Sequence, residues 1–120
     1  MESLLPSLPA LLVLAVLAEG PAHGYQIAAA VNEQSGDVLD LKEGTLYPRL
    51  YQLEREGFVR AQWQSDSGRR VRVYELTDAG RTRLQRDREE WRKRVEAADR
   101  VLSPAARLRQ GGGIARYGDL

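Results

Sequence analysis

The segment DLKEGTLYPRLYQLEREG, residues 40–57, has the pattern of a short helix with one apolar and one polar face. Its apolar positions recur at spacings of four and three residues, which places them on one helical stripe: Leu46, Leu50 and Leu53. The stripe predicted to lie opposite is polar: Thr45, Arg49, Gln52 and Glu56. Hydroxyl, guanidinium and amide groups can hydrogen-bond to base edges and phosphates. The segment therefore predicts a helix that is suited to reading DNA, although this pattern alone is not specific.

Two residues are expected to shape the ends of this helix. Gly57 is predicted to adopt the left-handed conformation that terminates many helices. A proline inside a helix is usually disruptive, because its ring meets the carbonyl group four residues earlier, which for Pro48 belongs to Gly44. We therefore expect Pro48 to lie in or near the first turn, where its missing N–H costs least.

After this helix the apolar period changes from 3.6 residues to two, which predicts a β-hairpin. Apolar and polar residues alternate from 59 to 64, with Trp63 on the apolar side, and residues 65–68 (SDSG) are typical of a turn. A second strand is predicted from 69 to 76. Three arginines lie at or beside the hairpin tip: Arg69, Arg70 and Arg72. They either belong to an ordinary solvated surface or contact a nucleic-acid backbone.

Residues 8–18 are almost wholly apolar, and three interpretations are open. A signal peptide needs a basic region before the apolar run, but Glu2 is the only charge there. A membrane span needs about 20 apolar residues, more than this run contains. The pattern favours the third interpretation, a helix that is buried on most sides. In a small protein such a helix suggests that a second chain covers part of it.

Residues 22–34 predict a second helix, and residues 20–24 are expected to connect it to the first. His23 either acts as a proton switch or helps to cap or pack the start of this helix, and we favour the second role. Two helices, a short extended piece, the amphipathic helix and a hairpin form the order of a winged helix-turn-helix. The predicted fold is thus mainly α with a small β-hairpin. In this arrangement the amphipathic helix is the recognition helix and enters the major groove of DNA. The hairpin, called the wing, lies along the DNA backbone.

Residues 78–102 predict a long last helix, capped by Thr77, that packs along another helix. Its apolar residues repeat every seven positions in two neighbouring rows. The remaining positions, Asp87 among them, are densely charged and predict a solvated face with helical ion pairs. The first helix, of the same or a second chain, is the expected partner. The predicted dimer interface comprises Leu11, Leu12, Leu84, Trp91, Val95, Ala98 and Leu102.

The 120 residues are expected to divide into a winged helix-turn-helix at 1–76, a dimerisation helix at 77–102 and a flexible tail at 103–120. The net charge is only +1, but the charge is distributed unevenly. Residues 1–41 contain five acidic residues and no lysine or arginine, whereas residues 42–72 contain seven basic and four acidic residues. A local basic stripe of this kind is typical of nucleic-acid binding.

Composition excludes several classes of function. The chain has no cysteine, which excludes disulfides, thiolate metal sites and thiol redox sensing, and which fits a reducing cytoplasm. A single histidine disfavours a zinc site. The sequence contains no phosphate-binding loop and no convincing pair of carboxylates, so we expect neither an enzyme nor a cofactor.

Three motifs at these spacings carry a resemblance to a known family: HGYQI at 23–27, EGTLYPRL at 43–50 with LEREG at 53–57, and LTDAG at 76–80. Together with residues 14–18, residues 69–74 and Trp91, they resemble the PadR-like transcriptional regulators over residues 8–102. The single C-terminal helix is similar to the short-chain branch of that family.

The resemblance implies a homodimer, formed through the first and last helices, that binds double-stranded operator DNA and usually represses its own or neighbouring genes. A two-fold dimer implies a palindromic operator. The DNA contacts implied by position are Tyr25, Thr45, Tyr47 and Arg49, with the wing arginines on phosphates or in the minor groove. Gln52 joins them as a base-edge contact on its chemistry alone. Lys42 stands where many members carry a small polar cap, and it could add a phosphate contact.

Trp91 has two interpretations. In multidrug-sensing relatives the tryptophan at this position lies at the dimer centre, where paired indoles stack on flat aromatic ligands, which implies an aromatic effector. Packing of the dimer seam explains a tryptophan here without any ligand, and we favour it slightly. A winged-helix module for protein–protein contact is the alternative function, and the arginine-tipped hairpin counts against it.

Overall fold

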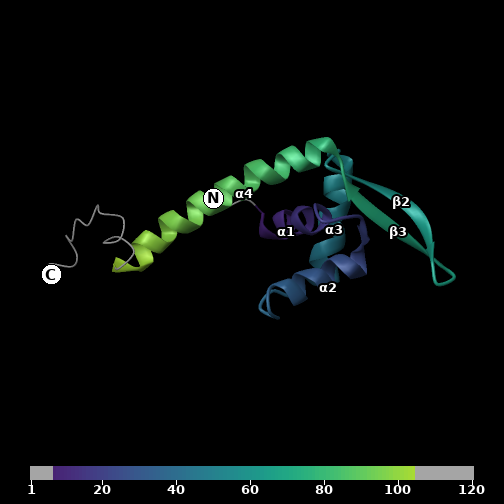
Figure 1. Cartoon of the computed structure of the whole chain (residues 1–120), viewed down its shortest axis with the longest axis horizontal. Coiled ribbons are helices and arrows are strands. Elements are labelled where there is room, and N and C mark those ends of the chain that lie inside the picture. Colours follow the sequence, from purple (N-terminus) through teal and green to yellow (C-terminus); the bar gives the residue numbers. More distant parts are fainter. Residues whose placement is uncertain (1–6, 105–120) are drawn as a thin grey trace.

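The computed structural model describes residues 7–104, which fold into four helices and a three-stranded antiparallel sheet (Figure 1). In chain order the elements are α1 (Leu8–Leu17), β1 (Ala22–His23), α2 (Gly24–Gln34), α3 (Glu43–Arg55), β2 (Val59–Asp66), β3 (Arg69–Leu76) and α4 (Asp78–Leu102). The strands lie in the order β1-β3-β2. The predicted mainly α winged helix-turn-helix is confirmed. Strand β1 was not predicted, because two residues are too few to show a period of two.

Helix α1 lies at the centre of the fold and packs against α2, α3, α4 and β3. Val13 and Leu14 are completely buried, and Leu12 on another side of the helix is half-buried. The interpretation of this segment as a buried helix is confirmed. None of the helices within residues 7–104 has the length and apolarity needed to cross a bilayer. Leu11, predicted at the dimer interface, is only 8% exposed in the single chain, so the core of one subunit already covers it.

Helix α2 begins at Gly24, two residues later than predicted, because Ala22 and His23 pair with β3 as a strand. His23 is the N-cap of the helix. Its Nδ1 accepts a hydrogen bond from the Gln26 N–H at 3.3 Å, and the Gln26 side-chain oxygen accepts one from the His23 N–H at 3.0 Å. These two bonds form a reciprocal capping box. The predicted capping role of His23 is confirmed.

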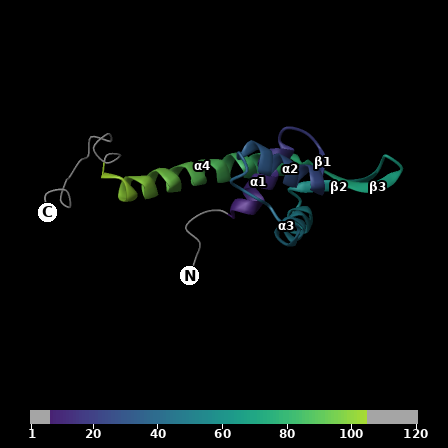
Figure 2. The same ribbon diagram turned by 90° about the horizontal axis from the view of Figure 1, so that it is seen from below.

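Strands β2 and β3 form a hairpin that extends beyond the core (Figures 1 and 2). Its turn contains only Ser67 and Gly68, with φ angles of 54° and 80°, as in the tight turns that suit the twist of a hairpin. The predicted four-residue turn at 65–68 was therefore too long. The core side of the hairpin is buried only in the part nearest the core, at Val59, Tyr74 and Leu76. Trp63, predicted on this apolar side, is 58% exposed because the hairpin has already left the core at its position.

The C-terminal end of α3 follows the prediction. Gly57 has a φ of 83°, and the Phe58 N–H donates to the Leu53 carbonyl oxygen at 2.9 Å. This bond and the left-handed glycine define a Schellman cap.

The other end of α3 differs from the prediction. The helix starts at Glu43, so Pro48 lies in its second turn and not near the first. A proline at this position removes the N–H that would have bonded to the Gly44 carbonyl group. The apolar period begins only at Leu46, so it does not reveal that the helix already begins at Glu43.

Helix α4 begins at Asp78 and is capped by Thr77, as predicted. The Thr77 hydroxyl accepts a hydrogen bond from the Gly80 N–H at 3.1 Å and donates one to the Gly57 carbonyl oxygen at 2.6 Å. Gly80 lies so close to the Phe58 carbonyl oxygen that there is no room for a Cβ atom. These contacts fasten the start of α4 to the end of α3. The far half of α4 extends away from the other elements (Figures 1 and 2).

One stripe of α4 runs along its whole length at helical spacings: Gly80, Leu84, Asp87, Trp91, Val95, Ala98 and Leu102. The first half is buried against the same chain, so Leu84 belongs to the subunit core although it was predicted at the dimer interface. The second half is exposed, and Leu102 is 81% exposed. Asp87, predicted among the solvated charges, is only 6% exposed, because it lies on the buried stripe with its carboxylate 2.6 Å from the Arg83 guanidinium.

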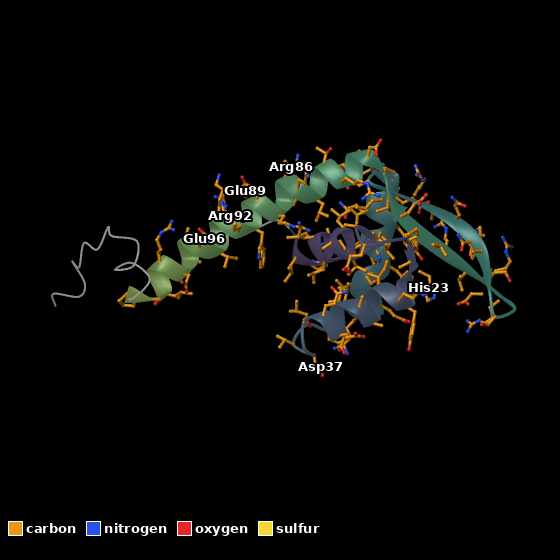
Figure 3. All side chains as sticks on the ribbon, viewed as in Figure 1. His23, Asp37, Arg86, Glu89, Arg92 and Glu96 are labelled. Carbon is orange, nitrogen blue, oxygen red and sulfur yellow. The ribbon has the colours of Figure 1, made fainter. Side chains whose placement is uncertain are left out.

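The outer side of α4 carries the predicted helical ion pairs (Figure 3). The guanidinium of Arg92 donates to Glu89 at 2.6 Å and to Glu96 at 2.7 Å. The hydrogen bonds to these two carboxylates raise the pKa of Arg92, so it is charged at every physiological pH. From residue 105 onward, the predicted flexible tail (103–120) lies outside the described residues.

Candidate nucleic-acid interface

The exposed face of α3 is the first component of the candidate interface. Figure 2 shows α3 almost end-on at the edge of the molecule, with its outer side uncovered by any other described element. The exposed residues of this face form a row at spacings of four, three and four: Gly44, Pro48, Tyr51 and Arg55. Thr45 is also exposed, but Arg49 and Gln52 are half-buried at the edge of the face.

The polar stripe predicted to lie opposite the leucines is therefore displaced from the centre of the exposed face. With 100° of rotation per residue, Thr45, Arg49 and Gln52 lie only about 100° from the leucine stripe, and not 180°. The sequence already contained the signal for the exposed row, which lies two residues before each leucine of the buried stripe. It was missed because Gly44 and Pro48 are not side chains that contact DNA in an obvious way.

Arg49 and Gln52 act on each other. The Nη1 of Arg49 donates to the side-chain oxygen of Gln52 at 2.9 Å. A guanidinium that is held in this way is less free to move than an unpaired one, and the amide nitrogen of Gln52 remains available as a donor. The pair therefore offers a fixed group of hydrogen-bond donors at the margin of α3.

A groove of about 840 Å³ separates α3 from the hairpin and from the start of α2. Aromatic residues from all three parts of the fold line it: Tyr25, Tyr47, Tyr51 and Trp63. Tyr25 is 78% exposed, and its ring centroid lies 6.3 Å from that of His23. His23 lies where α2 meets the hairpin (Figure 3), with its Nε2 3.7 Å from the Asp66 carboxylate. The groove brings the predicted contacts Tyr25 and Tyr47 together with the wing.

Tyr47 forms part of the groove wall next to Gly24. A Cβ atom on Gly24 would collide with the Tyr47 ring, which explains a glycine at the first position of α2. Burial raises the pKa of the Tyr47 phenol, and the nearby Glu43 and Tyr51 raise it further. The phenol therefore stays protonated at neutral pH and can donate a hydrogen bond to an anionic group.

The wing arginines differ in their surroundings. Arg69 and Arg70 have no acidic partner within the part of the chain that the structure describes. The guanidinium of Arg70 lies 4.9 Å from the centroid of the Trp63 ring, which is a cation–π distance. Arg72, in contrast, donates to Glu54 of α3 at 2.7 Å. Two of the three predicted wing arginines are thus available for an external anion, while the third holds the wing against α3.

Lys42 precedes the first turn of α3 and makes no side-chain cap bond, as expected. Its ammonium group lies 2.6 Å from the Asp40 carboxylate, and the hydrogen bond to Asp40 raises the pKa of Lys42. Residues 7–104 contain no cluster of three or more histidine, aspartate or glutamate side chains that could hold a metal ion.

Trp91 marks the point where α4 leaves the core. Its side chain is half-buried and packs against the core of its own chain. Beyond it the predicted interface residues Val95, Ala98 and Leu102 are all exposed on the same stripe. Leu12 of α1 is half-buried. Of the predicted interface residues, those that remain available to a second chain therefore lie on the far half of α4 and on one side of α1.

Comparison with known proteins identifies relatives. The family model described as "Transcriptional regulator PadR-like family" matches residues 13–86. The transcriptional regulator Rv3488 of Mycobacterium tuberculosis is 38% identical over 71 residues, which cover 59% of this chain and 64% of that protein. A 37.1 kDa protein encoded in transposon TN4556 of Streptomyces fradiae is 44% identical over 77 residues. The match spans 64% of this chain but only 21% of the Streptomyces protein.

Two solved structures are also similar. A PadR family transcription regulator from Clostridium difficile R20291 has a TM-score of 0.70 and 29% identity, with 79% of this chain and 98% of that chain covered. The PadR protein of Bacillus subtilis, solved in complex with operator DNA, has a TM-score of 0.60 and 28% identity. That match covers 66% of this chain and 45% of the Bacillus chain.

Proposed function

The chain belongs to the PadR-like family of transcriptional regulators, and on this basis we propose that it is a homodimeric repressor that binds a palindromic, double-stranded operator. Each subunit places α3 in a major groove and its hairpin along the adjacent backbone. The contacts in this proposal come from α3 and the margin of its exposed face, from the groove and from the wing: Tyr25, Lys42, Thr45, Tyr47, Arg49, Gln52, Arg69, Arg70 and Arg72.

The observation that carries this proposal is the pair of arginines on the hairpin tip. Arg69 and Arg70 are exposed and have no acidic partner among residues 7–104, and they lie at the tip of the hairpin that extends beyond the core (Figure 1). A solvated protein surface usually distributes opposite charges together, whereas a phosphate backbone requires unpaired cations. Arg72 contributes differently, because its bond to Glu54 sets the position of the wing relative to α3.

The dimer in this proposal is supported by the far half of α4. Val95, Ala98 and Leu102 form an apolar stripe that is exposed in the single chain. Val95 and the half-buried Leu12 lie on the two helices that would meet a second subunit. Apolar stripes on long helices are stabilised by packing against an equivalent stripe. Two subunits joined in this way present two α3 helices to one side of a duplex.

Arg70→Ala tests the backbone contact. We expect the variant to bind operator and random duplexes more weakly by similar factors, and to reduce the slope of log Kd against log salt by about one per subunit, because one phosphate contact is lost. Fluorescence anisotropy with duplexes from the region upstream of the gene, repeated across salt concentrations, measures both quantities.

Arg60→Ala is the matched control for this experiment. Arg60 lies on the same hairpin, but Glu75 already neutralises it at 2.6 Å, so its loss should leave the salt slope nearly unchanged. An unaltered slope for Arg70→Ala would show that Arg70 does not contact phosphate. A wild-type protein that binds no duplex at any salt concentration would favour the alternative function, a winged-helix module for protein–protein contact.

The proposal extends to an aromatic effector that binds beside Trp91. The support is the position of this half-buried indole on the α4 stripe, next to the apolar residues that a second subunit would cover. A flat ligand between two such indoles would gain stacking on both faces. It could change the separation of the two α3 helices only if it binds one dimer geometry better than another.

Trp91→Ala is expected to weaken the binding of flat aromatic dyes at least tenfold, because the stacking surface is removed, on the order of 1.4 kcal/mol. Equilibrium dialysis against a panel of such dyes measures the change without using protein fluorescence. Trp63→Ala is the control, since Trp63 is the exposed tryptophan of the wing. If Trp63→Ala weakens dye binding and Trp91→Ala does not, the aromatic site lies in the groove beside α3.

A further inference from the structure

The glycines of the helices separate into two kinds. At Gly24 a Cβ atom would collide with the Tyr47 ring, and at Gly80 it would collide with the Phe58 carbonyl group, so the fold itself requires glycine at both positions. At Gly44 a Cβ atom would meet no atom within 4 Å, and the backbone is not left-handed. Glycine destabilises a helix relative to alanine. Nothing within residues 7–104 therefore explains why position 44 of α3 has no side chain.

Pro48, one turn further along the same face, adds to this observation. It is exposed, it lies in the second turn of α3, and it removes a helical N–H from the interior of the helix. Because Gly44 has no side chain and Pro48 has only a short ring, no long side chain extends from the helix surface in the first half of the exposed row. The second half of the row carries the half-exposed ring of Tyr51 and the guanidinium of Arg55.

The chemistry of Tyr51 and Arg55 suits DNA bases. Arg55 is exposed and has no acidic partner in the part of the chain that the structure describes, so its guanidinium is free to donate to an external acceptor. Arginine donates two parallel hydrogen bonds to guanine in the major groove, and apolar groups contact the thymine methyl. Arg49 lies on the same helix, but it is half-buried and bonded to Gln52.

We infer that the row Gly44–Pro48–Tyr51–Arg55 is the line along which α3 approaches DNA most closely, and that Tyr51 and Arg55 determine the preferred base sequence. Gly44 and Pro48 allow the helix backbone to come within contact distance of the duplex, a role in which only small or flat residues fit. The Arg49–Gln52 pair lies at the margin of the contact. This inference rests on the proposed function, because it assigns the residues through which the same surface reads DNA.

The test uses a duplex that the wild-type protein selects from a randomised pool, and a duplex of scrambled sequence. Gly44→Ala and Gly44→Leu should raise the melting temperature of the free protein, because both residues favour helix more than glycine does. They should nevertheless weaken binding to the selected duplex, tenfold or more for alanine, and further for leucine, because each added side chain occupies the space that DNA needs. A Gly44→Ala variant that binds the selected duplex as tightly as wild type would overturn the inference.

Repeated selection from the pool tests the base-reading part. Arg55→Ala and Tyr51→Ala should change the selected base sequence at defined positions. Arg49→Ala removes an arginine from the margin of the same helix, so it should lower the affinity but leave the selected base sequence unchanged. The reverse pattern, in which Arg49→Ala alone changes the selected sequence, would overturn the assignment while leaving the protein a DNA-binding regulator. A wild-type protein that enriches no duplex would overturn this inference and the proposed function together.

Discussion

Replacement of Gly80 by alanine is expected to lower the free energy of unfolding by about 3 kcal/mol or more, as do the more severe cases of overpacking in a protein core. A Cβ atom at this position would overlap the Phe58 carbonyl oxygen, which cannot move freely because it also accepts a hydrogen bond from the Thr77 N–H at 3.2 Å. The substitution therefore forces the start of α4 away from the end of α3. Chemical denaturation followed by circular dichroism measures the loss.

Gly44→Ala is the matched control for this measurement, since it adds the same methyl group to a helical glycine that has open space around it. The control should be as stable as wild type or slightly more stable. Equal stability of Gly80→Ala and wild type would mean that α4 can shift along its own chain without loss. That result would contradict the close attachment of α4 to the end of α3.

The double substitution Val95→Asp with Leu102→Asp is expected to convert a dimer into monomers and to weaken operator binding by on the order of a hundredfold or more. Both residues lie on the exposed apolar stripe of α4, so two carboxylates from each subunit would be buried without partners in the proposed interface. Loss of the dimer removes the second α3 helix from the complex, and with it the gain in affinity from simultaneous binding at two half-sites. Sedimentation velocity reports the assembly state, and anisotropy reports binding.

The control places two aspartates on the flanks of the same helix, about 100° of rotation from the apolar stripe. Gln85→Asp with Ala97→Asp introduces equal charge at exposed positions away from the apolar stripe, and it should leave both assembly and binding nearly unchanged. If wild type sediments as a monomer and still binds its operator with high affinity, the dimer part of the proposal is wrong. If both double variants dissociate, the interface lies elsewhere on α4.

Most of the fold could be predicted from local patterns. The apolar period located α3 and α4, Thr77 and Gly57 located two helix ends, and the change of period located the hairpin. These signals depend on residues within a few positions of one another, which is why they are legible in a single sequence. Strand β1 is the exception, because it exists only through its pairing with β3, about fifty residues away.

The candidate site was less predictable because its composition depends on which polar side chains the fold leaves exposed. Arg49 and Gln52 have the expected chemistry, but the rotation of α3 places them at the margin, whereas the centre of the face begins with a glycine and a proline. Arg72 has the same chemistry as Arg70, but Glu54 is within reach of only one of them. Asp87 lies on a buried stripe that a charged residue normally avoids, and its contacts with the guanidinium groups of Arg83 and Arg86 explain its position.

The attachment of α4 to the end of α3 gives the last helix the properties of a lever. Its fulcrum is the Thr77 hydroxyl, bonded at once to Gly57 and Gly80. A helix of 25 residues is about 37 Å long at 1.5 Å per residue, so a tilt of about 5° at the fulcrum moves the far end by about 3 Å. In the proposed dimer the far end is held by the other subunit, and the same tilt would instead swing the reading helix. Small rearrangements near Thr77 would then be amplified into changes in the spacing of two half-sites.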